Sequence, residues 1–372
     1  MDFNDILNLM VQRRASDLFI TPDMPPCLKV DGVISAVSRT RLNEVQTSEL
    51  AQSLMSPEQR EEFRRTKECN FAFSAKDVGR FRVSAFVQRD SVAMVLRRIE
   101  TRIPVIEELG LPQLLKDLAM TKRGIIFLVG ATGTGKSTTL ASMVGHRNRN
   151  SAGHIISIED PIEYMHSHAS CIVTQREVGI DTESYEVALK NTLRQAPDVI
   201  LIGEIRTREA MEHAIAFAET GHLVLTTLHA NNANQALERI IHFFPEDRRD
   251  QVLLDLSLNL RGIVAQQLVM RTDGVGRKAI VEILLNTPLA ADLIMKGEIH
   301  KLKDLMKRSA ENGMVTFDQA LYEAAKRGEI SEQDALVHAD SANEVRLMLK
   351  LGEVRPGSRE RDMNAVGLVD EM

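Results

Sequence analysis

One stretch restricts the possible folds of this chain more than any other: an apolar run, a glycine-rich turn and a helix-compatible run in immediate succession. Residues 124–144 read GIIFLVGATGTGKSTTLASMV, and Gly130, Gly135, Lys136 and Ser137 match the pattern G-x-x-x-x-G-K-[ST]. Glycines let successive backbone N–H groups turn toward a phosphate, and a helix N-terminus adds partial positive charge. We therefore expect a P-loop between a buried strand and a helix. A chance glycine turn is the weaker alternative.

The residues after Gly124 predict an α/β fold, because apolar strands alternate with helices as in a mostly parallel sheet covered on both faces. The interval 250–269 is interpreted as one long apolar helix, followed by a hairpin at 271–278 and by helices with capping-box starts near Ser331 and Ser341. The expected strands of the sheet are Ile125–Val129, His154–Ile158, Val199–Ile202 and Leu223–Thr227.

The first hundred residues predict a separate, small α+β domain. Asp31-Gly32 is typical of a tight hairpin, and Ser56-Pro57 is typical of a helix start. The pattern of residues 71–99 predicts antiparallel strands. The expected organisation is a domain at 1–99, a linker at 100–112, a second domain with C-terminal helices at 113–352, and a polar, disordered tail at 353–372.

Composition excludes several classes of protein. The net charge of -6 argues against a protein whose main surface binds nucleic acid. The three cysteines are scattered, which suggests neither a disulfide framework nor a zinc site. No apolar run approaches the roughly 18–20 residues that span a bilayer, and the start does not resemble a signal peptide. We expect a cytoplasmic protein that reaches a membrane only through protein partners.

The P-loop predicts a nucleoside triphosphate with Mg²⁺ as the ligand. Lys136 is expected to reach the β and γ phosphates, the Ser137 hydroxyl to ligate Mg²⁺, and Thr138 to contact the α phosphate. The expected nucleotide-binding residues are Gly130, Ala131, Thr132, Gly133, Thr134, Gly135, Lys136, Ser137 and Thr138.

Hydrolysis also needs a carboxylate at the end of a neighbouring strand and a group that orients water. Glu204 follows the buried run DVILIG, and Glu159, Asp160 and Glu163 crowd around Pro161 after the run IISI. Most acidic residues at strand ends are solvated turn or capping residues, which is the alternative for each. Two acidic strand ends beside one P-loop favour a catalytic edge.

Histidines and arginines supply further candidates. His222 begins the fourth strand and His229 follows its end, where a phosphate sensor would lie; a hydrogen-bonded scaffold role is the alternative. Arg80, Arg82 and Arg97 belong to the N-terminal strands. They form either a solvated face or a set that reaches a phosphate in a neighbouring subunit.

Four segments resemble, in order, the motifs of the bacterial secretion ATPases of type II secretion and type IV pilus systems. The Walker A motif corresponds to GATGTGKST, the Asp box to IEDPIEY, the Walker B motif to LRQAPDVILIGEIR and the His box to TGHLVLTTLHANNA. Two earlier segments are similar to the N-terminal domain of the pilus retraction branch, namely ASDLFITPDMPPCLKVDGVI and GRFRVSAF. The resemblance therefore covers almost the whole chain. It implies a homohexameric ring of subunits with a PAS-like N-terminal domain, a RecA-like core and ATP bound between them.

The resemblance also implies roles for individual residues. Glu163 becomes the catalytic glutamate, Glu204 the Walker B residue acting on Mg²⁺ through water, and Lys136 a catalytic P-loop residue. Glu159 and Asp160 complete the Asp box. The His box comprises His222 and His229, and the N-terminal arginines that contact nucleotide in trans match Arg82, Arg97 and, less closely, Arg80.

Three departures from the family pattern stand out. Thr207 replaces an aspartate after the Walker B strand, Phe19 replaces a common histidine, and residues 289–309 replace a C-terminal helix typical of the PilT type. They favour a retraction-branch member distinct from that type.

The predicted function is an ATP-hydrolysing motor that drives or assists pilus retraction, with a PilT-type ATPase and an inner-membrane platform protein as partners. An accessory ring that hydrolyses little ATP alone is the alternative. A DNA-translocating RecA-like ring is less compatible with the acidic composition.

Overall fold

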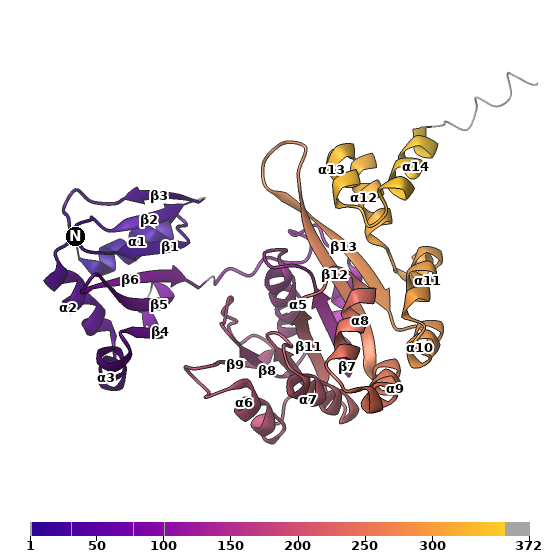
Figure 1. The fold of residues 1–372 in the computed structure, drawn as a ribbon, viewed down its shortest axis with the longest axis horizontal. Coiled ribbons are helices and arrows are strands. Elements are labelled where there is room, and N and C mark those ends of the chain that lie inside the picture. Colours follow the sequence, from indigo (N-terminus) through magenta and orange to yellow (C-terminus); the bar gives the residue numbers. More distant parts are fainter. Residues whose placement is uncertain (1, 31, 77, 100, 354–372) are drawn as a thin grey trace, which may run out of the picture. The chain divides into compact units, whose positions relative to one another are not determined.

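The computed structural model describes residues 2–30, 32–76, 78–99 and 101–353, and its contacts divide the chain into two compact units (Figure 1). The N-terminal unit consists of Met1–Ile103 with two later segments, Asp160–Ser167 and Gln175–Ser184. The remainder forms the C-terminal unit. The boundary at Ile103 falls within the interval expected to be a linker. The tail expected at 353–372 lies, apart from Glu353 at a helix end, outside the described residues.

The N-terminal unit contains a six-stranded antiparallel sheet in the order β3-β2-β1-β6-β5-β4. Val30 lies opposite Val33, as expected for a two-residue hairpin, and Ser56 caps its helix with a capping box. The elements are α1 (Phe3–Gln12), β1 (Asp17–Ile20), β2 (Cys27–Val30), β3 (Val33–Ala36), α2 (Glu44–Leu54), α3 (Pro57–Thr66), β4 (Glu68–Ala75), β5 (Gly79–Gln88) and β6 (Ser91–Arg98).

Successive side chains of β5 point to opposite faces of this sheet. Phe81 and Val83 are buried in the core with Leu7 and Met10 of α1, whereas Arg82, between them, points to the other face. The antiparallel strands predicted within residues 71–99 are therefore confirmed.

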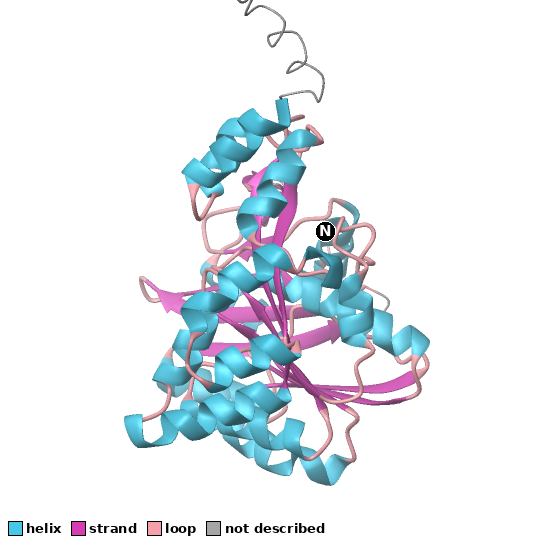
Figure 2. Ribbon diagram, turned by 90° about the vertical axis from the view of Figure 1, so that its right-hand side faces the viewer, coloured by secondary structure: helices cyan, strands magenta, loops and turns pink. Residues whose placement is uncertain are grey.

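The C-terminal unit contains a seven-stranded sheet in the order β13-β12-β7-β11-β10-β8-β9. Strands β12, β7, β11, β10 and β8 run parallel, and β13 pairs antiparallel with β12. Helices lie on both sides of the sheet (Figure 2), so the predicted α/β class is confirmed. The strands are β7 (Gly124–Val129), β8 (Gly153–Glu159), β9 (Cys171–Glu177), β10 (Val199–Ile202), β11 (Leu223–Leu228), β12 (Leu260–Met270) and β13 (Arg277–Leu285).

Several helices of this unit begin at side-chain caps, Ser331 among them. The last three gather beside the β12–β13 hairpin (Figure 1). They are α4 (Leu114–Ala119), α5 (Lys136–Asn150), α6 (Tyr185–Thr192), η1 (Leu193–Gln195), α7 (Arg208–Glu219), α8 (Ala233–His242), η2 (Glu246–Arg248), α9 (Arg249–Asn259), α10 (Pro288–Met295), η3 (Ile299–Lys301), α11 (Leu302–Arg308), η4 (Ala310–Asn312), α12 (Phe317–Lys326), α13 (Glu332–His338) and α14 (Ala342–Glu353).

One element prediction was wrong. The interval interpreted as a single helix is α9 followed directly by β12, which inserts between β7 and β13. A strand buried on both faces has a continuous apolar sequence, so periodicity does not separate it from a buried helix. The glycine and β-branched residues of RGIVAQQLV were the signal that favours a strand.

Candidate active site

The P-loop, Gly130–Ser137, joins the fully buried strand β7 to helix α5. Gly133 and Gly135 have φ angles of 80° and 85°, which L side chains rarely adopt. The Lys136 side chain lies over the loop, and its Nζ donates hydrogen bonds to the carbonyl oxygens of Gly130 (2.9 Å) and Ala131 (2.8 Å). The ammonium group is thus held at the place where a P-loop receives phosphate.

A cavity of about 330 Å³ lies beside the start of α5. Its lining includes Thr138 and three basic residues of the β12–β13 hairpin, Arg271, Arg277 and Lys278. No sequence motif predicted these basic residues, because they lie far from the P-loop along the chain.

Glu204 and His229 meet at the carboxyl edge of the same sheet. Glu204 follows β10 and His229 follows β11, and these strands are parallel neighbours. His229 Nε2 lies 3.2 Å from Glu204 Oε2, and Arg206 forms an ion pair with Glu204 Oε1. The imidazole is close enough for charge pairing when protonated, yet the contact lacks hydrogen-bond geometry, since Oε2 is buried without a hydrogen-bond partner.

The unsatisfied oxygen of Glu204 fits a magnesium site. Mg²⁺ keeps several waters and binds proteins through one or two oxygen ligands together with substrate phosphates. No group of three or more metal-ligating side chains occurs among the described residues. Ser137, in the first turn of α5, and Glu204, through water, would hold it.

His222 lies at the opposite end of β11 from His229. Its Nδ1 is 3.1 Å from both the Phe217 carbonyl oxygen and Thr220 Oγ1, which ties the end of α7 to the start of the strand. The structure therefore places the two predicted histidines at opposite ends of β11, and these contacts of His222 fit the scaffold alternative.

Glu159 ends β8 in the C-terminal unit, whereas Asp160 and Glu163 belong to a segment of the N-terminal unit. The peptide bond between Asp160 and Pro161 is cis, and Glu163 is exposed. The carboxylate of Glu177, which is 1% exposed, accepts hydrogen bonds from the Ile162 backbone N–H (3.4 Å) and from Arg82 Nε (3.2 Å). Sequence reasoning did not identify this residue, which links an Asp-box residue to a predicted arginine.

The three predicted arginines share one face of the N-terminal sheet. Arg82 pairs with Arg97 across β5 and β6, and Arg80 lies two residues from Arg82. Arg97 Nε donates to Asp17 Oδ1 at 2.9 Å, although 67% of the arginine side chain is exposed. Both Arg82 and Arg97 thus have acidic partners within their own unit.

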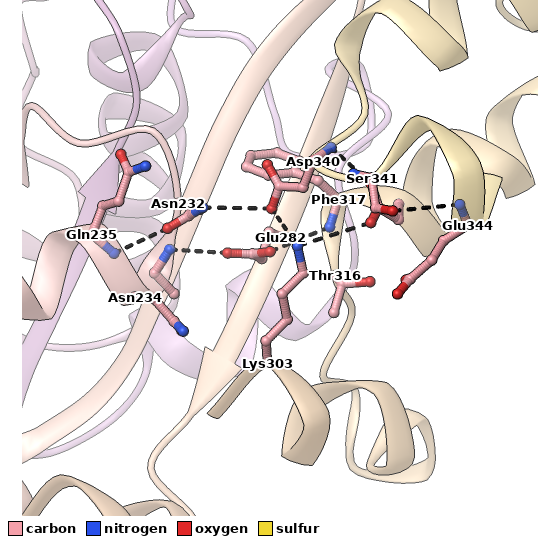
Figure 3. A network of polar contacts seen from close by, with 12 residues as sticks. Asn232, Asn234, Gln235, Glu282, Lys303, Thr316, Phe317, Asp340, Ser341 and Glu344 are labelled. Atoms are coloured by element: carbon pink, nitrogen blue, oxygen red, sulfur yellow. Dashed lines mark hydrogen bonds and ion pairs between the residues drawn. The ribbon is translucent and has the colours of Figure 1, made fainter. Parts of the chain in front are cut away.

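A polar network fastens the last helices to the segment that follows His229 (Figure 3). Glu282 of β13 accepts hydrogen bonds from the Ala233 backbone N–H (2.9 Å) and the Phe317 backbone N–H (3.3 Å), at the starts of α8 and α12. Burial raises the pKa of Glu282 to about 7, against the lowering effect of these two donors. Lys303 forms an ion pair of 2.7 Å with Asp340, next to the buried Asp318.

The parallel sheet, the P-loop and the acidic edge define a P-loop ATPase of the secretion type. The family described as "Type II/IV secretion system protein" matches residues 2–292, and the chain belongs to that family. The resemblance inferred from the four motifs is confirmed.

Particular relatives cover nearly the whole chain. It is 67% identical over 352 residues to the type IV pilus ATPase PilU of Pseudomonas aeruginosa, covering 95% of this chain and 92% of that protein. It is 36% identical over 335 residues to the PilT retraction ATPase of the same organism, covering 90% and 97%. A crystal structure of the pilus retraction motor PilT with bound ADP matches with a TM-score of 0.87 and 39% identity, covering 93% and 99%.

The higher identity to PilU agrees with the departures from the PilT type noted in the sequence. Within the described part of the chain, no helix is both long and apolar enough to cross a membrane.

Proposed function

We propose that this ATPase is a motor of the type IV pilus machine that drives or assists pilus retraction and thereby twitching motility. The observation that carries the proposal is the arrangement at one sheet edge. A P-loop follows β7, and Glu204, with an unsatisfied carboxylate oxygen, follows β10. The names of the relatives supply the biological setting.

The proposed mechanism assigns one task to each group of residues. The P-loop N–H groups and Lys136 bind the phosphates, and Ser137 and Glu204 hold the cation, which when bound neutralises phosphate charge. Glu163 orients the attacking water, while His229 responds to the occupancy of the site through Glu204. Arg82 and Arg97 stabilise transition-state charge in a neighbouring subunit after leaving their acidic partners.

This mechanism requires an oligomer, and we propose a homohexameric ring. It acts at the inner membrane as a peripheral cytoplasmic assembly with a PilT-type ATPase and a platform protein. An accessory ring with little activity of its own is the second candidate, because, of these two relatives, it is the less similar one, PilT, that is named a retraction ATPase.

Glu163→Gln tests whether Glu163 orients the attacking water. Because glutamine keeps the shape but accepts protons poorly, ATP turnover should fall by about 100-fold or more while ADP affinity stays unchanged. Exposed Glu183→Gln, in another segment of the same unit, is the matched control. Unchanged turnover in the Glu163 variant would rule out this role, and negligible turnover of the purified wild-type protein would favour the accessory ring.

A further inference from the structure

We propose that Gln266 is a positioning residue that holds the P-loop in its phosphate-binding shape. The inference rests on the proposed nucleotide site and adds a residue outside its motifs. It was hidden by the interpretation of residues 250–269 as a helix, since only a strand next to β7 brings Gln266 to the loop.

The register of the sheet places Gln266 at the end of β7. Strand β12 runs parallel to β7, and Ala265 lies opposite Val129, the last residue before the P-loop. The next residue along β12 is therefore level with the start of the loop. Gln266 is 3% exposed, and a buried side-chain amide needs partners for both its donor and its acceptor.

The two partners of the Gln266 amide lie in the P-loop and in the helix that follows it. Its Nε2 donates a 2.7 Å hydrogen bond to the Thr134 carbonyl oxygen within the loop. Its Oε1 accepts a 2.7 Å hydrogen bond from Thr139 Oγ1 in the first turn of α5. One side chain thus bridges the loop and the helix that it leads into, and holds the Thr134 carbonyl oxygen toward β12.

Two P-loop glycines pack directly against Gln266. A Cβ atom at Gly130 would lie 2.5 Å from the Gln266 carbonyl oxygen, and one at Gly135 would lie 2.8 Å from its Nε2. Real Cβ atoms do not approach other atoms so closely. These glycines are needed for the approach of β12 as well as for their backbone angles.

The next residue of β12 offers a matched control. The Gln267 side chain makes its hydrogen bonds with His338 of α13, to the carbonyl oxygen at 3.2 Å and with Nδ1 at 3.2 Å. It has the same chemistry and strand as Gln266 but no hydrogen bond to the P-loop.

The test compares Gln266→Met with Gln267→Met in the full chain, by the Kd of a fluorescent ADP analogue, the KM and kcat for ATP, and the Tm with and without ADP. Loss of two buried hydrogen bonds at the loop should raise Kd and KM about tenfold or more in the Gln266 variant, with a smaller change in kcat, and should reduce the ADP-induced rise in Tm. Gln267→Met should lower the Tm of the free protein and leave Kd unchanged.

Gln266→Glu, which keeps the length and the acceptor but loses the donor to Thr134, is measured alongside and decides the question if the methionine variant does not fold. Wild-type affinity in a folded Gln266 variant, or equal weakening in the Gln267 variant, would overturn the proposal. Lys136→Ala distinguishes failure of the proposed nucleotide site from failure of the positioning role of Gln266. If it and wild type bind ADP equally, the nucleotide site itself is misplaced; if it loses ADP while the Gln266 variants retain it, only the positioning role fails.

Discussion

Glu204 and Glu282 are two acidic residues of one sheet with opposite surroundings. The Glu204 carboxylate has one buried oxygen without a hydrogen-bond partner, at the edge where the P-loop lies. Both oxygens of Glu282 accept backbone N–H groups at the starts of two helices, and the residue is 1% exposed. We infer that a carboxylate oxygen without a hydrogen-bond partner at the sheet edge is available for chemistry, whereas a carboxylate with both oxygens hydrogen-bonded stabilises the fold.

The largest expected effect is the loss of ATP turnover in Glu204→Gln. Glutamine keeps the volume of the side chain but removes the charge that acts on the cation, so kcat should fall by about 100- to 1,000-fold. The free energy of unfolding should change by less than about 1 kcal/mol, because the side chain makes no buried hydrogen bond through Oε2. Steady-state ATPase assays and urea unfolding measure the two quantities. Glu212→Gln, which breaks an exposed pair with Arg208 on α7, is the control and should leave kcat unchanged.

The second effect is a pH dependence of stability that originates at Glu282. Its folded-state pKa of about 7 exceeds the ordinary value of 4.5, so between these values the folded state retains a proton that the unfolded state has lost. The contribution of this residue is fully present below pH 4.5 and is lost as pH rises through 7, at about 1.4 kcal/mol per pH unit within the window.

Urea unfolding of the wild type and Glu282→Gln across that window measures this contribution. The difference between the two free energies of unfolding should change with pH in the stated direction, since glutamine does not titrate. A difference that stays constant from pH 5 to pH 8 would show that Glu282 is ionised throughout.

The smallest effect concerns an ion pair near the same helices. Lys307 Nζ lies 2.7 Å from Glu344, but 31% and 48% of these side chains are exposed. Solvent screens such a pair, so Glu344→Gln should lower the free energy of unfolding by less than about 1 kcal/mol. Urea unfolding at low and high salt measures it. If Glu344→Gln lowered the free energy of unfolding as much as the contribution of Glu282, exposed carboxylates would stabilise the fold as strongly as buried, hydrogen-bonded ones.

The sequence was sufficient for features that depend on neighbouring residues. The P-loop pattern, the four central strands and the positions of Glu204 and His229 at strand ends follow from local spacing, and the structure places them on one sheet edge. Local sequence could not reveal Gln266 or Glu177, because each acts through partners far away along the chain. The β12 strand was missed because its apolar run lacks the alternation of a half-exposed strand.

His222 shows the opposite limit of sequence reasoning. A motif groups it with His229, yet the strand between them separates the two residues to opposite edges of the sheet. The motif therefore does not predict where each histidine lies on the sheet.

The most direct measurement of the central claim is ATP turnover by purified Glu204→Gln and Glu282→Gln proteins, assayed side by side with their stability from pH 5 to pH 8. We expect Glu204→Gln to lower ATP turnover by about 100-fold or more and to keep the wild-type pH dependence of stability. We expect Glu282→Gln to keep turnover within about threefold and to lose the Glu282 contribution to that pH dependence. Equal losses of turnover in both variants, or full turnover in Glu204→Gln, would show that the two carboxylates do not have these separate roles.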